Sequence, residues 1–128
     1  MNKRKIDQLL PKARQAIIEI GISEDQVTVS STFRGYISSF GAAVYNGSLL
    51  AAIAFFNQQK SAKDDRPKLM QAIHQMLGSE KKDLFEHAET AQTPAERRKM
   101  KADILNCAIA LKLAMNLFEL KKEKGAPE

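Results

Sequence analysis

Apolar residues recur at helical spacing through one segment of this chain, although that segment is also rich in glycine and serine. The first recurring positions are Phe33, Ile37, Phe40 and Val44. Steps of three or four residues place these side chains on one face of an α-helix, where they can form part of a core. A second apolar stripe runs from Leu49 to Phe56. The pattern therefore predicts two consecutive helices that each bury one face.

Glycine lies inside the first of these helices, at Gly35 and Gly41. Each glycine destabilises a helix interior by roughly 1 kcal/mol relative to alanine. We expect the close approach of a neighbouring helix to compensate, so Gly35 and Gly41 are candidates for contact within the domain or between subunits. Gly47 is expected to end the helix in a left-handed conformation, and Ser48 to cap the next one.

The run RGYISSFGAAVYNGSLLAAIAFF resembles the signature of the small helical subunit of the type III-B CRISPR effector, the Cmr complex. The likeness extends upstream to KIDQLLPKARQAI and downstream through RPKLMQAIHQML, over roughly the first sixty per cent of the chain. The resemblance implies a non-catalytic subunit of an RNA-guided antiviral ribonucleoprotein. In that family several copies stack along the complex and help line the groove where target RNA pairs with the guide.

The same resemblance implies partners for the chain. They are the other Cmr effector subunits, together with guide and target RNA contacted through the backbone. The isolated protein is expected to be a monomer or to associate weakly with itself, with several copies present in the complex.

Length and composition fit a single domain over residues 1–128. No apolar run approaches the roughly 18 residues that span a bilayer, and no apolar stretch follows the basic start, so we expect a cytoplasmic protein without a membrane partner. Cys107 is the only cysteine, which excludes an internal disulfide. The last residues, 125–128, are expected to form a disordered tail.

Helical spacing also governs the rest of the chain. A first helix is predicted over about Asp7 to Ile20, with Pro11 at a kink or in its true first turn. Residues 22–31 are expected to form a turn or loop before a cap at Ser30 or Ser31. Asp65 is expected to cap a helix that Gly78 ends.

Two further helices are predicted near the C-terminus. Ser79 is expected to open a short charged helix. Thr93-Pro94-Ala95-Glu96 is a capping box, which predicts a long last helix over about Pro94 to Lys122. The whole pattern predicts an all-α fold, a compact single-domain bundle of about six helices with a long C-terminal helix.

The net charge of +5 is suggestive of a polyanionic partner. Arg34 lies inside the signature, where it could bind a phosphate or pair with a carboxylate. A basic cluster follows the signature. Together the candidates for RNA-backbone contact are Arg34, Lys60, Lys63, Arg66 and Lys68.

The sequence offers few groups for catalysis. His74 and His87 lie outside any zinc-ligand spacing, and Cys107 lies on the apolar stripe of the last helix. No glycine pattern matches a phosphate-binding loop. We therefore predict no enzyme activity, no catalytic residue, no metal site and no cofactor.

Two other functions stay open at this point. One is a helical protein–protein adaptor that does not bind nucleic acid. The other is a small helical DNA-binding regulator with a helix-turn-helix around Asn46-Gly47-Ser48. The second fits less well, because the segment Leu49 to Phe56 is too apolar for a recognition helix.

Overall fold

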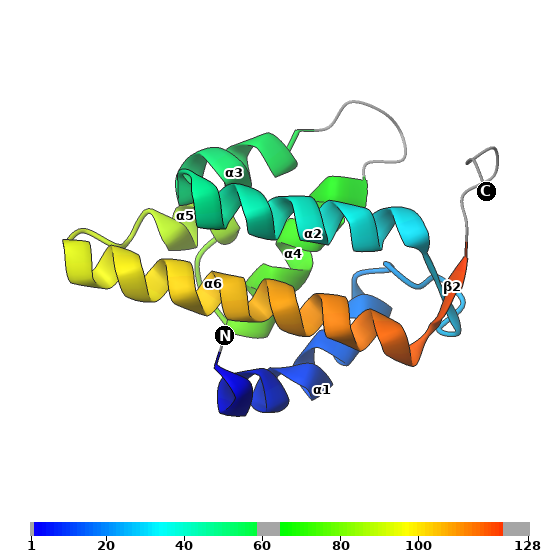
Figure 1. The fold of residues 1–128 in the computed structure, drawn as a ribbon. Helices are drawn as coiled ribbons and strands as arrows, with labels where there is room; N and C mark the ends of the chain where they lie inside the picture. The colour runs from blue at the N-terminus through cyan, green and yellow to red at the C-terminus, as the bar shows by residue number, and fades with distance from the viewer. Residues whose placement is uncertain (1, 59–64, 122–128) are drawn as a thin grey trace.

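Six α-helices account for most of the part of the chain that the structure describes, residues 2–58 and 65–121 of a computed structural model (Figure 1). They are α1 (Lys3–Glu19), α2 (Ser31–Asn46), α3 (Leu49–Phe56), α4 (Asp65–Leu77), α5 (Leu84–Ala88) and α6 (Pro94–Ala114). A 3₁₀ turn η1 (Met115–Leu117) and two short strands, β1 (Thr28–Ser30) and β2 (Glu119–Lys121), complete the described elements. The predicted all-α bundle is confirmed.

The longest helix, α6, organises the packing. It lies alongside α2 and packs against α1 and α4 as well (Figure 1). Helix α3 packs against α2, α4 and α5 on the other side of the bundle. Fully buried side chains from five helices meet in one core. Examples are Ile17, Phe40, Ile53, Ile73 and Leu111.

Helix α1 begins earlier than the sequence pattern predicts. The Asn2 side chain accepts a hydrogen bond from the Lys5 backbone N–H at 3.1 Å and so caps a helix that starts at Lys3. Pro11 lies well inside this helix and not in its first turn. Its side chain is exposed, which keeps the proline ring away from the core.

Helices α2 and α3 confirm the two predicted stripes. The buried residues of α2 are Phe33, Ile37, Phe40 and Val44. Side chains of Ser30 and Ser48 accept hydrogen bonds from Thr32 and Ala51 at the starts of α2 and α3. The conformation predicted for Gly47 is wrong: its φ of −143° is not left-handed.

The short helix α5 starts later than predicted. The Asp83 side chain, and not Ser79, caps it by accepting a hydrogen bond from Glu86 N at 2.9 Å. Ser79 instead accepts from Lys81 N in the preceding turn. Gly78 has a φ of +64°, which agrees with its predicted role of ending α4.

Helix α6 starts as predicted and ends earlier. Both capping-box hydrogen bonds are present between Thr93 and Glu96. The predicted end at Lys122 is wrong, because the helix stops at Ala114. The chain then enters β2, which pairs in parallel with β1 so that Val29 lies opposite Leu120. Backbone pairing with β1 replaces the continuation of the helix.

The loop before β1 is held by one carboxylate. Asp25 accepts hydrogen bonds from Val27 N at 2.9 Å, Thr28 N at 2.7 Å and Thr28 Oγ1 at 2.8 Å. These hydrogen bonds, first those from Thr28 and then that from Val27, hold the pKa of Asp25 far below its usual value. No helix forms between α1 and β1, which agrees with the turn or loop predicted before α2.

We expect Asp25→Asn to lower the melting temperature at pH 7. The ionised carboxylate is stabilised in the folded protein, so its contribution is present above the unfolded pKa of about 3.9 and is lost as the pH falls below it. The difference in melting temperature between the two proteins is therefore expected to shrink as the pH falls below about 4. Circular-dichroism melts from pH 7 to pH 3 measure this, with Glu24→Gln as the control for net charge. A difference that stays constant over this range would contradict the prediction.

Candidate nucleic-acid interface

Arg34 lies in the first turns of α2 and faces the end of α6. Its Nη1 donates a hydrogen bond to Oδ1 of Asn116 in η1. The sequence analysis proposed a phosphate or a carboxylate as the partner of Arg34. In the structure the partner is the side-chain amide oxygen of Asn116. A guanidinium has five N–H donors, so this bond fixes the side chain and leaves donors for an anion.

Arg66 is held between two aromatic rings. Its Cζ lies 5.3 Å from the ring centroid of Tyr36 on α2 and 5.4 Å from that of Phe55 on α3. Both distances are within the range of a cation–π interaction. The side chain of Phe55 is 51% exposed, so the stack lies at the surface. Stacking restricts the guanidinium of Arg66 while its edge stays available for hydrogen bonds.

Two lysines lie near the same end of the bundle. Lys68 Nζ on α4 is 3.5 Å from the carbonyl oxygen of Gly21, which it can donate to. Lys121 on β2 is paired in register with Ser30, the residue that caps α2. The predicted long last helix includes Lys121, whereas the strand pairing places this residue beside the start of α2.

The described candidates therefore surround the N-terminal half of α2 and come from several elements. Arg34 and Tyr36 are two positions apart on a helix, so they point about 200° apart. Arg34 contacts η1 on one side, and Arg66 contacts Tyr36 on another. The cations therefore lie on more than one side of the N-terminal half of α2. Lys60 and Lys63 lie outside the described residues.

Basic residues at the start of α6 have other contacts. Lys99 forms a salt bridge with Asp103 at 2.8 Å, and Arg97 donates to the Gln92 carbonyl. Lys101 Nζ donates to the carbonyl oxygen of Tyr45 at 3.2 Å, at the end of α2. This group lies at the opposite end of α2 from Arg34, so it forms a separate basic surface.

Gly35 and Gly41 have no close neighbour within the described part of the domain. An added Cβ at either position would meet no heavy atom within 4 Å, apart from the local helix backbone. The expected contact of Gly35 and Gly41 with a helix of the same domain is therefore not supported. A contact of these glycines with another chain stays a prediction.

His74, His87 and Cys107 lie on three different helices, α4, α5 and α6. His74 Nε2 lies 2.8 Å from the Lys81 carbonyl oxygen, within hydrogen-bond distance. Burial, followed by the charge of His74, lowers the pKa of His87. Burial in the core also raises the pKa of the Cys107 thiol to about 12, so the reactive thiolate is disfavoured near neutral pH. Within residues 2–58 and 65–121, no three His, Cys, Asp or Glu side chains gather as a metal site.

The molecule is an all-α single-domain bundle, and one end of it carries cations from α2, α4 and β2. The model of the CRISPR-associated protein (Cas_Cmr5) family matches residues 10–117. The match covers most of the chain, so this protein belongs to the Cas_Cmr5 family and is a small subunit of the Cmr (type III-B) complex in CRISPR defence. It therefore associates with other Cmr subunits.

Comparison with curated proteins finds no match, and comparison with solved structures finds none either. In the described part of the chain, no helix combines the length and apolar character needed to cross a membrane.

Proposed function

We propose that this chain is a non-catalytic Cmr subunit that stacks along the complex and helps line the groove in which guide and target RNA pair. Its contribution is to bind the phosphate backbone through Arg34, Arg66 and Lys68, together with Lys60 and Lys63. Each cation neutralises a phosphate and releases counterions, so binding is tolerant of sequence. The protein acts in the cytoplasm in antiviral defence, without catalysis, a cofactor or a membrane.

The observation that carries this proposal is the gathering of cations from separate elements around one end of α2. Arg34 and Arg66 are both positioned by neighbouring side chains, Asn116 for one and Tyr36 with Phe55 for the other. Positioned guanidinium groups lose less side-chain entropy when they bind a phosphate. This arrangement supports a backbone-binding surface.

One observation favours the adaptor function: an exposed, largely apolar surface lies between α2 and α6. The DNA-binding alternative has weaker support, because α3 has the sequence LLAAIAFF and carries no charged side chain. Such a helix cannot neutralise phosphates or read polar base edges in a major groove.

A salt titration separates these functions. We expect the purified chain to bind single-stranded RNA in 0.05 M salt with little dependence on sequence, and to lose affinity linearly on a log–log plot as the salt rises. Fluorescence anisotropy with labelled RNA, single-stranded DNA and duplex DNA measures the slopes. A preference for duplex DNA would support the regulator. Absence of binding to all three would leave the adaptor and contradict RNA-backbone contact.

Sedimentation of the isolated chain in the same buffers checks the expected oligomeric state. We propose that it is a monomer or associates weakly, and that the other subunits stabilise the stack. A tight oligomer without them would contradict this part of the proposal.

A further inference from the structure

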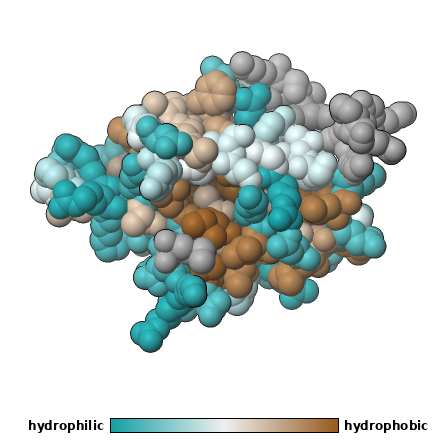
Figure 2. Space-filling view, in the orientation of Figure 1, coloured by the Kyte–Doolittle hydropathy of each residue, from teal (hydrophilic) through white to brown (hydrophobic). Residues whose placement is uncertain are grey.

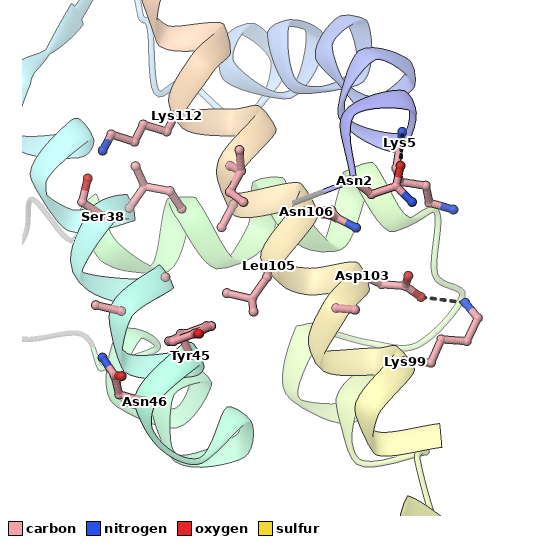
Figure 3. Close-up of a pocket in the computed structure, with 16 residues that line it drawn as sticks. Asn2, Lys5, Ser38, Tyr45, Asn46, Lys99, Asp103, Leu105, Asn106 and Lys112 are labelled. Carbon is pink, nitrogen blue, oxygen red and sulfur yellow. Dashed lines mark hydrogen bonds and ion pairs between the residues drawn. The ribbon is translucent and has the colours of Figure 1, made fainter. Parts of the chain in front are cut away.

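An open groove runs between α2 and α6, and it is separate from the cations around the start of α2. Its volume is about 980 Å³, and Asn2 and Lys5 near the start of α1 border one side of it. Figure 3 shows Leu105 pointing into the space between the two helices. The hydrophobic surface beside α2 in Figure 2 lies over this region. The groove is thus an apolar surface that is hollowed.

Both walls of the groove have helical spacing. The α2 wall is formed by Ser38, Gly41, Ala42 and Tyr45. The α6 wall is formed by Ala102, Leu105, Ile109 and Lys112. Two stripes with this periodicity, side by side, form the surface that a third helix packs against. Small side chains predominate on the α2 wall, which allows a close approach.

The size of the groove matches a short helix. Lys99 and Lys112 border it on α6 and are separated by about 20 Å at 1.5 Å per residue. A length of about 20 Å accommodates about three to four turns of a partner helix at 5.4 Å per turn.

Gly41 provides an independent reason to place a helix here. It lies inside α2, where glycine is unfavourable, and nothing within the described domain needs the absent side chain. It also lines the groove. Gly35 is equally free of neighbours but does not line the groove. A partner helix that packs on Gly41 would make use of the missing Cβ.

Charge at the rim specifies the chemistry of the partner. Lys99 is neutralised by Asp103 at 2.8 Å, but no carboxylate of the described residues is within salt-bridge distance of Lys5 or Lys112. Figure 3 shows Lys112 and Lys5 at separate positions around the groove. The rim therefore carries two uncompensated positive charges around an apolar floor. Carboxylates that flank an apolar stripe would complement it.

We propose that the groove between α2 and α6 binds an amphipathic α-helix of another protein, with Asp or Glu residues flanking its apolar face. An apolar floor suits a helix far better than a phosphate backbone, since phosphates need cations along their path. The partner helix packs its apolar side chains on Leu105, Ile109 and Gly41. Its carboxylates pair with Lys5 and Lys112. This binding does not depend on contact with RNA.

Gly41→Leu and Gly35→Leu form a matched pair for the test. Both variants are expected to keep or raise the melting temperature, because each replaces a helical glycine at an open position. In a Cmr complex reconstituted from purified subunits, Gly41→Leu is expected to reduce incorporation at least tenfold, and Gly35→Leu to leave it unchanged. Retained incorporation of a folded Gly41→Leu chain would overturn the proposal. RNA affinity of the isolated chain, measured in parallel, is expected to be unchanged by Gly41→Leu, so failure of this proposal is distinguishable from failure of RNA binding.

A photo-reactive phenylalanine at Tyr45, which is 73% exposed on the groove wall, identifies the occupant. Mass spectrometry of the cross-linked complex is expected to find a peptide from another subunit with apolar residues at helical spacing and flanking carboxylates. Cross-links to RNA, to a second copy of this chain or to a segment of different pattern would overturn the proposal, as would their absence. Lys112→Glu is expected to weaken incorporation and Arg98→Glu, outside the groove on the same helix, to preserve it.

Discussion

Replacing Leu111 with alanine is expected to lower the free energy of unfolding by about 2–5 kcal/mol. Leu111 lies in α6 with a side chain that is fully buried, at 0% exposure. Because α6 packs against α1, α2 and α4, a cavity at this point weakens several helix contacts together. Thermal or urea unfolding followed by circular dichroism measures the loss.

Leu113 provides the matched control on the same helix. Its side chain is 42% exposed, so Leu113→Ala removes the same atoms from a partly solvated position and leaves no enclosed cavity. We expect this variant to change the free energy of unfolding by about 0.5 kcal/mol. Equal losses for Leu111→Ala and Leu113→Ala would mean that the buried face of α6 is assigned incorrectly.

Removing the four cations that follow the signature is expected to produce the largest functional effect. A variant with alanine at Lys60, Lys63, Arg66 and Lys68 loses up to one phosphate contact for each side chain. Each lost contact weakens RNA binding roughly five- to tenfold at 0.1 M salt and flattens the salt slope by about one unit. Anisotropy titrations at four or more salt concentrations measure both quantities.

The comparison variant removes four exposed cations elsewhere, at Lys81, Lys82, Arg97 and Arg98. The two variants have the same net charge, so a difference between them reports position and not total charge. Melting curves control for the stack of Arg66 on Tyr36 and Phe55, which the first variant removes. If the comparison variant loses RNA binding and the first variant keeps it, the proposed face is wrong. If neither loses binding, the cations act only as a solubilising surface.

Placement of the cations required the tertiary structure. The sequence shows that Arg34 lies within the signature and that Arg66 and Lys68 follow it. It does not show that Asn116 binds Arg34, or that Tyr36 and Phe55 enclose Arg66. These contacts join residues from separate elements, and no local pattern encodes them. The sequence does not show that Lys121 lies near α2 either, because the β-branched residues 27–29 favour an extended backbone without indicating which segment pairs with them.

The groove between α2 and α6 also combines a feature that the sequence shows with one that only the tertiary structure shows. Gly41 is visible in the sequence as an unfavourable residue in a helix, which led us to predict a close helix contact there. That the surrounding wall faces an open groove depends on how α2 and α6 pack. The sequence suggested a neighbour inside the domain, and the described domain has none.

The sequence by itself determined the presence of the helices, their buried faces and the side-chain caps at the starts of α2, α3 and α6. Period-3.6 apolar patterns and residues such as Thr93 with Glu96 act through neighbours only a few positions away, so they can be read locally. Only the tertiary structure decided where α6 ends. Residues 115–121 contain good helix formers, yet Glu119 N donates to the Val27 carbonyl oxygen and the chain joins β1. Hydrogen bonds to a strand about ninety residues away outweigh a helix propensity that varies by less than about 1 kcal/mol per residue.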